Sequence, residues 1–257
     1  MPQAARRAVI GVLTDIDDTL TTEGRLTAAA YAALERLRAA GKIVIPVTGR
    51  PAGWCDHIAR MWPVDAVVGE NGAFYMRHDG THGKLVRRFV TPEATRRDQR
   101  DRIAALGEAI VAAVPGCALA SDQRYRESDL AIDYCEDVDA LPRDDVDRIV
   151  ALMEAAGMTA KVSSIHVNGW FGTYDKLTTT KLLLREVRGI DLDLYREAFA
   201  FVGDSPNDAP MFDYFPNAVG VANLLRFADR VPTLPAYVTD AEAGAGFVEF
   251  VDALLGA

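Results

Sequence analysis

The chain has 257 residues, of which 49% are hydrophobic and 25% are charged, a composition typical of globular proteins with one large or two modest α/β domains. Its formal net charge of −9 argues against a nucleic-acid partner, because nucleic-acid-binding surfaces carry a basic excess. The three scattered cysteines predict neither a disulfide framework nor a zinc site and fit a reducing cytoplasm.

The sequence shows the pattern of neither a membrane helix nor an export signal. No stretch of the sequence approaches the roughly 18 consecutive apolar residues of a membrane helix. The first apolar run stops at Asp15 and is too short for a signal peptide. We therefore expect no membrane partner and a cytoplasmic location.

The first seventy residues alternate between strand and helix patterns. Short apolar runs rich in β-branched residues predict buried strands, and amphipathic stretches with capping residues predict helices. The predicted strands are 8–14, 43–47 and one that begins at 66, and the predicted helices are 27–41 and 51–62. Pro46 weakens the pairing of the second strand. This order predicts right-handed crossovers and a parallel sheet.

The middle of the chain has a different order of elements. It predicts helices at 92–114 and 142–156, each followed by two short strands, at 117–121 and 130–134 and at 158–163 and 165–171. Such an order favours an antiparallel sheet with helices on one face. We interpret residues 87–174 as an inserted α+β domain.

Alternation of strand and helix returns after the insertion. The predicted elements are a helix at 178–189, a strand at 198–202, short strands near 218–222 and 236–240, and a helix at 246–255. We therefore expect residues 1–86 and 175–257 to form one doubly wound α/β domain with a parallel sheet.

Two carboxylates, Asp15 and Asp17, directly follow the first predicted strand. Positions two apart in an extended segment face the same side, so both can enter one pocket. One carboxylate can act as a nucleophile that forms an acyl phosphate, while the other protonates a leaving oxygen and then deprotonates water. Close carboxylates have pKa values pushed apart, which suits these two roles. An acidic turn after a strand is the simpler alternative.

The segment Thr48-Gly49-Arg50 follows the second predicted strand. A hydroxyl, a glycine with an exposed backbone N–H and a helix start suit a phosphate group, although an N-capped turn would look the same. Lys176, where the insertion returns to the main domain, could offset phosphate charge. We prefer it to Lys181 because we expect it before the helix rather than within it.

The segment Gly203–Asp208 follows the strongly apolar strand at 198–202. Asp204 is placed to reach a cation shared with Asp15, and Asp208, one helical turn further on, can orient the cation's surroundings. Hard oxygen ligands, few of them from protein, are what Mg²⁺ prefers. A capped helix start is the alternative. All of these segments can meet at one site, because ligands bind at the carboxyl ends of parallel strands.

In order and separation, DIDDTLT, VTGR, the lysine of YDKLTTTKLLL and GDSPND resemble the four motifs of the haloacid dehalogenase (HAD) superfamily of phosphatases. The resemblance implies a Rossmannoid core and Mg²⁺-dependent hydrolysis of a small phosphate monoester through an aspartyl-phosphate. It implies that Asp15 is the nucleophile and Asp17 the acid/base. It also implies that Thr48 and Lys176 bind the phosphoryl group. The implied magnesium ligands are Asp15, the backbone carbonyl of Asp17, and Asp204, supported by Asp208.

The insertion lies between the second motif and the motif lysine, and the segment at 69–73 reads GENGA. Both features resemble the subgroup with a large α/β cap, which includes Cof-type phosphatases, sucrose-phosphate phosphatase and phosphomannomutase. The implied substrate is a sugar phosphate or a related phosphometabolite. Asp18 departs from this subgroup, which often has glycine there, and we expect the change to be tolerated.

Several residues are candidates for binding the substrate. An arginine can grip a carboxylate or a second phosphate, although a solvated loop arginine is the alternative for those in the cap. The candidates are Gly49, Arg50, Asn71 and Asn207 in the motif segments, and Arg124, Arg126, His166 and Asn168 in the cap.

Other functions remain open at this stage. A phosphomutase would use the same aspartate pair but needs a more basic cap. A phospho-receiver needs neither the aspartate pair nor a cap, and a non-catalytic phosphosugar-binding protein would not need every catalytic position filled. The sequence leaves a monomer and a homodimer equally open.

Overall fold

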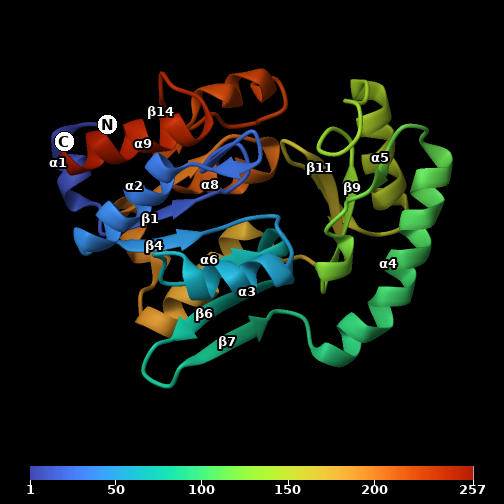
Figure 1. Ribbon diagram of the computed structural model, residues 1–257, viewed down its shortest axis with the longest axis horizontal. Coiled ribbons are helices and arrows are strands. Elements are labelled where there is room, and N and C mark those ends of the chain that lie inside the picture. Colours follow the sequence, from blue (N-terminus) through green and yellow to red (C-terminus); the bar gives the residue numbers. More distant parts are fainter. Residues whose placement is uncertain (257) are drawn as a thin grey trace.

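The computed structural model describes residues 1–256 as a core that carries a cap on one side (Figure 1). The core is built on a five-stranded sheet in which all neighbours are parallel. Its strands, in spatial order, are β14 (Tyr237–Val238), β13 (Asn217–Gly220), β12 (Phe199–Gly203), β1 (Gly11–Thr14) and β4 (Ile43–Pro46). The order places the earliest and a late strand side by side, as expected for a doubly wound sheet.

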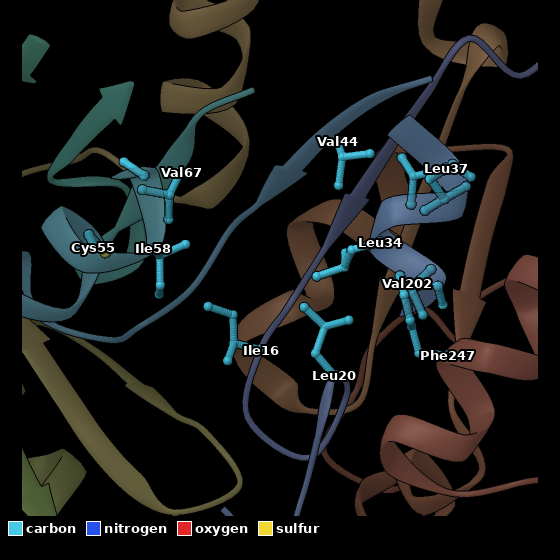
Figure 2. Close-up of a cluster of buried hydrophobic side chains, with 14 of the residues drawn as sticks. Ile16, Leu20, Leu34, Leu37, Val44, Cys55, Ile58, Val67, Val202 and Phe247 are labelled. Atoms are coloured by element: carbon cyan, nitrogen blue, oxygen red, sulfur yellow. The ribbon is translucent and has the colours of Figure 1, made fainter. Parts of the chain in front are cut away.

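Helices cover both faces of this sheet because its strands are apolar on both sides. Val12 and Val44 face one layer, and the next residue of each strand, Leu13 and Ile45, faces the other. One layer contains α2 (Ala28–Ala39), α3 (Ala52–Met61) and α9 (Ala243–Leu255), and the other contains α6 (Lys176–Arg188), α7 (Leu192–Tyr195) and α8 (Ala209–Tyr214). Figure 2 shows the first layer, where Leu34 and Phe247 meet Val202 of the sheet.

The start of the chain differs from the expected strand over 8–14. Residues Gln3–Ala8 form the short helix α1, and the strand begins only at Gly11. Gly11 lies opposite both Phe199 and Ile43, and a Cβ there would lie 2.4 Å from the Phe199 ring. The strand β1 therefore begins at a glycine, which is small enough to fit between Phe199 and Ile43.

The third expected strand is only loosely attached to the parallel sheet. β5 (Val67–Gly69) touches it through a single bridge between Val47 and Val68 and pairs antiparallel with β6 (Phe74–Asp79), which pairs with β7 (Lys84–Phe89). Pro46, which has no N–H to donate, ends β4 just before that bridge.

The cap is an antiparallel four-stranded sheet backed by two helices. Its strands, in spatial order, are β10 (Thr159–Val162), β11 (His166–Trp170), β9 (Asp129–Asp133) and β8 (Ala118–Leu119), and its helices are α4 (Glu93–Ala113) and α5 (Arg143–Ala155). Figure 1 shows α4 along the outer edge of the cap, far from the core sheet. The expected boundary between residues 86 and 87 falls inside β7, so we propose that the inserted unit begins after Phe89.

Short elements complete the chain. The hairpin of β2 (Thr21–Thr22) and β3 (Arg25–Leu26) follows the first motif, and the 3₁₀ turns are η1 (Glu70–Gly72), η2 (Gln123–Tyr125), η3 (Arg196–Ala198), η4 (Pro206–Asp208) and η5 (Ala222–Phe227). Among the described residues, no helix combines the length and apolar character needed to cross a membrane.

Candidate active site

The polar motif segments converge where the carboxyl ends of β1, β4 and β12 meet the cap. Asp15 follows β1, Thr48 follows β4 and Asp204 follows β12. The backbone N–H of Asp15 donates to the carbonyl of Val202 at 2.8 Å, which fixes the first motif against the strand of the fourth. The parallel register therefore sets the spacing of the site.

Lys176 lies between two carboxylates at the bottom of the site. Its Nζ is 3.1 Å from Oδ1 of Asp15 and 2.7 Å from Oδ1 of Asp208, and its side chain is 1% exposed. Burial alone would lower the pKa of Lys176, but Asp15 and Asp208 raise it, so the ammonium stays charged. Lys181 instead pairs with Asp193 on the surface.

Lys176 is placed by the start of α6 and not by a preceding loop. It is the first residue of the helix, directly after the N-cap Asp175, whereas we expected it before the helix. The side chain of Asp175 accepts from the backbone N–H of Thr178 at 2.7 Å and closes a capping box. The N-cap residue Asp175 thus fixes the backbone from which Lys176 reaches the site.

Asp15, Asp204 and Asp208 form a buried acidic cluster. One ligand atom from each lies within 4.8 Å of the others, and Oδ1 of Asp15 lies against the Lys176 ammonium. Burial raises the pKa of Asp15 to about 8, against the opposing effect of Lys176, and burial together with Asp15 and Asp208 raises that of Asp204 well above its ordinary value. Three carboxylates facing one ammonium fit a hard divalent cation, which would restore the charge balance.

Asp208 has little capacity left as a direct ligand. Its Oδ2 accepts from the backbone N–H groups of Asp204 and Ser205 at 3.1 and 3.3 Å, and its Oδ1 accepts from Lys176. It holds the η4 loop and the lysine together. Asp204 is oriented by Thr19 and Asn223, whose side chains donate to its two oxygens at 3.1 and 3.2 Å.

Asp17 points away from this cluster, toward Arg50. Both of its carboxylate oxygens accept from Nε of Arg50, at 2.9 and 3.0 Å. The side chains of Asp15 and Asp17 nevertheless line one small cavity, as the alternation of an extended segment predicts. That cavity has a volume of about 10 Å³, which is roughly the space for a single water.

Some of the phosphate-binding candidates line the same cavity, whereas Thr48, Lys176 and Asn71 are not part of its lining. Thr48 is fully buried, and its hydroxyl accepts from the backbone N–H of Arg50 at 3.0 Å. Gly49, Arg50 and Asn207 line the cavity. Asn71 supports Asn207, whose Nδ2 donates to Oδ1 of Asn71 at 3.2 Å.

Asn71 and Asp18 have left-handed backbone conformations, with φ of 53° and 51°. Asparagine and aspartate are the non-glycine residues that adopt this region most readily. The departure from glycine at Asp18 is therefore compatible with the turn that glycine would favour.

The two cap arginines that we considered as substrate ligands do not reach the cavity. Arg126 is buried, and its guanidinium is engaged by Asp122, Asp129 and the carbonyl of Gly49. It joins the cap to the second motif as a structural ion-pair network. Arg124 is exposed beside Tyr125. The cap instead lines the cavity with Ser163, Ile165, His166 and Asn168.

Two carboxylates at the boundary between core and cap were not singled out by the sequence. Glu136 pairs with Arg50 and His166 at 2.6 and 2.8 Å. Glu70 is fully buried and accepts from the backbone N–H groups of Ala52 in the core and of residues 127 and 128 in the cap. Glu136 belongs to no motif, and Glu70 lies in the segment at 69–73 but had no role assigned to it. Only the folded chain brings the two carboxylates to the boundary.

Comparisons with known proteins agree with this geometry. Residues 12–96 match the profile of the haloacid dehalogenase-like hydrolases. The chain is 30% identical over 250 residues to a phosphoglycolate phosphatase of Haloarcula marismortui, covering 93% of this chain and 95% of that protein.

Solved structures share the whole architecture at low sequence identity. They include Thermoplasma acidophilum 0175 (TM-score 0.70, 19% identity, covering 96% of this chain and 99% of that one). The C-terminal domain of C. albicans trehalose-6-phosphate phosphatase gives 0.70 at 13% identity, covering 98% and 94%. The sucrose-phosphatase of Synechocystis sp. PCC6803 gives 0.62 at 16% identity, covering 96% and 98%.

The chain belongs to the haloacid dehalogenase-like hydrolases, and its core carries an α+β cap as an insertion. Within that family it is a phosphatase of small phosphate monoesters. The fold class and the family expected from the four motifs are thereby confirmed.

Proposed function

We propose that this phosphatase hydrolyses a sugar phosphate or a related phosphometabolite with Mg²⁺, through an aspartyl-phosphate on Asp15. The observation that carries the proposal is the position of Asp15. Its carboxylate is buried between Lys176 and the acids of η4 and also faces the cavity beneath the cap. It thus pairs with the Lys176 ammonium and borders the space into which we propose that the substrate binds once the cap opens.

The first half of the reaction transfers the phosphoryl group to the protein. An oxygen of Asp15 forms a bond to phosphorus while the bond from phosphorus to the leaving oxygen breaks. Asp17 gives its proton to that leaving oxygen. The Thr48 hydroxyl, the Gly49 backbone N–H and the Lys176 ammonium hold the phosphoryl oxygens and offset their charge.

The second half returns Asp15 to its starting state. Asp17, now a carboxylate, takes a proton from water, whose oxygen bonds to phosphorus as the bond to Asp15 breaks. We propose Asp15, Asp204 and the backbone carbonyl of Asp17 as the ligands of Mg²⁺, with Asp208 supporting them. When bound, Mg²⁺ supplies positive charge that favours the ionised nucleophile and neutralises the phosphoryl group.

The cap face supports hydrolysis over mutase activity. A mutase must hold a bisphosphate and would need basic side chains over the site. The cap residues that line the cavity are a serine, an isoleucine, a histidine and an asparagine, namely Ser163, Ile165, His166 and Asn168. The small volume of the cavity implies that the cap opens to admit the substrate.

Location, assembly and domain division belong to the same proposal. The three cysteines are free thiols, which fits the cytoplasm, and we propose a monomer or a homodimer there. We further propose that the core comprises residues 1–89 and 175–256 and the cap residues 90–174.

Phosphate release from a panel of sugar phosphates, 2-phosphoglycolate, nucleotides and p-nitrophenyl phosphate tests the proposal. Each substrate is measured with Mg²⁺, with EDTA and with Asp15→Asn. We expect Mg²⁺-dependent turnover that falls at least about 10³-fold in the variant, because the amide cannot form the acyl phosphate. Full activity of Asp15→Asn, or turnover unaffected by EDTA, would contradict it.

A further inference from the structure

Arg50 connects the chemistry of the core to the cap. Its side chain is 4% exposed and lies with its guanidinium 4.3 Å from the centre of the Trp54 ring. Around it stand three carboxylates, one from the first motif and two from the cap, which are Asp17, Asp122 and Glu136. Burial would lower the pKa of Arg50, but Asp17 and Glu136 raise it, so the guanidinium stays charged.

The protein itself engages every nitrogen of this guanidinium. Nε donates to Asp17, Nη2 lies 2.8 Å from Asp17 and 2.6 Å from Glu136, and Nη1 donates to Asp122 at 3.3 Å. Glu136 is in turn fixed from the other side by Nε2 of His166 at 2.8 Å. Burial opposes the ionisation of Glu136, but the hydrogen bonds from His166 and Arg50 lower its pKa to about 2. Glu136 is therefore a fixed negative charge.

A second cavity, of about 330 Å³, opens beside the small one above Asp15. The two cavities share Asp17, Arg50 and Ile165. If the phosphorus of a substrate lies at Asp15, its leaving group would therefore extend past Asp17 into the second cavity. Four carboxylates and one guanidinium line it, namely Asp17, Asp18, Glu23, Glu136 and Arg50, together with the hydroxyl-bearing Thr21 and Ser164.

This lining favours some leaving groups over others. A carboxylate-bearing group would meet excess negative charge and find no free donor on Arg50, because Asp17 and Glu136 occupy it. A polyhydroxyl group can donate hydrogen bonds to the carboxylates. Specificity built by placing a like charge against the wrong ligand is a common device.

We propose that Glu136 is a specificity-determining residue that holds Arg50 and restricts this site to phosphate monoesters whose leaving group is uncharged and hydroxylated. The inference rests on the proposed function of the site. It places the substrate apart from that of the Haloarcula relative, whose name specifies phosphoglycolate.

Matched pairs of substrates test the proposal. In each pair one member has an uncharged, hydroxylated leaving group and the other has a leaving group that carries a carboxylate. One pair is 2-hydroxyethyl phosphate and 2-phosphoglycolate, and a second is glycerol 3-phosphate and 3-phosphoglycerate. We expect the wild-type kcat/KM to favour the neutral member of each pair by about tenfold or more. In Glu136→Gln the ratio should shift toward the anionic member by about tenfold, because a donor on Arg50 is released.

The control is Asp137→Asn, which removes the same charge from the neighbouring, exposed position of the loop and should leave both ratios unchanged. A wild-type preference for the anionic member would overturn the proposal even if Glu136→Gln failed to fold. So would an unchanged ratio in a folded Glu136→Gln protein. Turnover of p-nitrophenyl phosphate by the wild type separates these results from failure of the proposed function, in which no substrate would release phosphate.

Discussion

Asp15 and Asp17 sit two positions apart yet have opposite surroundings. Asp15 lies in a buried cluster with Lys176, while Asp17 is 15% exposed and paired with Arg50. Different surroundings are what assign two carboxylates to two roles. Arg50 also holds both oxygens of Asp17. In its proposed role as acid/base, Asp17 can therefore serve the substrate only when one of these oxygens is released.

Asp17→Asn should separate the two halves of the reaction. p-Nitrophenolate leaves without needing a proton, so Asp15 can still be phosphorylated, whereas hydrolysis of the aspartyl-phosphate lacks its base. Steady-state turnover should fall by about 10²–10⁴-fold. Rapid mixing should show a burst of p-nitrophenol equal to the enzyme concentration, and slow release without a burst would exclude the assigned role.

We expect the buried carboxylate of Asp15 to couple metal binding to pH. Its folded pKa of about 8 exceeds the ordinary 3.8, so between these values the folded state keeps a proton that the unfolded chain has lost. In EDTA this contribution makes the free energy of unfolding fall as pH rises. Mg²⁺ competes with that proton, so its stabilising effect should grow from about pH 5 to about pH 8, reaching about 2.7 kcal/mol at a hundredfold excess over Kd.

The difference in Tm between Mg²⁺ and EDTA, followed across this pH range, checks the coupling. Glu70, whose pKa burial also raises to about 8, adds a slope that both conditions share and that cancels in the difference. Asp15→Asn should reduce this pH dependence and leave the part that comes from Asp204, whose pKa is also raised. A Tm difference that shrinks toward pH 8 would rule the coupling out.

At the scale of elements, helix starts position the catalytic groups. The capping box of Asp175 fixes the first turn of α6 and so the reach of Lys176, and η4 is closed in the same way by Ser205 and Asp208. Such caps stabilise a helix wherever they occur. Here they also decide where a charge enters the site.

Two substitutions that each remove a helix N-cap side chain test whether such a side chain serves both stability and catalysis. Asp175→Ala and Thr27→Ala, the latter at the start of α2, each remove one side-chain cap and should each lower stability by about 1 kcal/mol. Only Asp175→Ala should also lower kcat, because α6 begins with Lys176, which we propose to be catalytic, whereas α2 carries no proposed catalytic residue. Equal kcat values for the two variants under conditions where both are folded would show that the helix N-cap at Asp175 is purely structural.

At the scale of the whole molecule, closure of the cap completes the site. The boundary is bridged at its centre by Arg50 and by Arg126, which donates to the carbonyl of Gly49, and at its rim by Arg143 with Asp229 and by Arg230 with Asp147. The cap also touches α3 closely, since a Cβ at Gly53 would lie 2.9 Å from Cβ of Tyr125. The core and cap therefore fit together only because Gly53 lacks a side chain.

Gly53→Ala should weaken closure while strengthening α3. Alanine in a helix is favoured over glycine by about 1 kcal/mol, so Tm should hold or rise. The methyl group should meet Tyr125 and keep the cap from seating, which lowers kcat several-fold. Adding Tyr125→Gly should restore kcat, and a single variant with unchanged kcat would show that this contact does not limit closure.

The sequence by itself determined the core fold, the insertion and the residues at the ends of three strands. Apolar runs, caps and motif order are local properties, and the parallel topology then brings Asp15, Thr48, Lys176 and Asp204 together. The local pattern was wrong at α1, where a strand was expected, because pairing partners decide where a strand begins. The division between core and cap stays a proposal.

The tertiary structure alone decided which charges surround the site. Arg126 is one candidate substrate ligand in the sequence, with a solvated loop arginine as the alternative, but folding buries its side chain between Asp122 and Asp129. Glu136 belongs to no motif, but folding sets it 2.6 Å from an arginine that lies 86 positions away in the chain. Charge interactions depend on distance and burial, and residues from the core and from the inserted cap acquire these only when the two parts pack together.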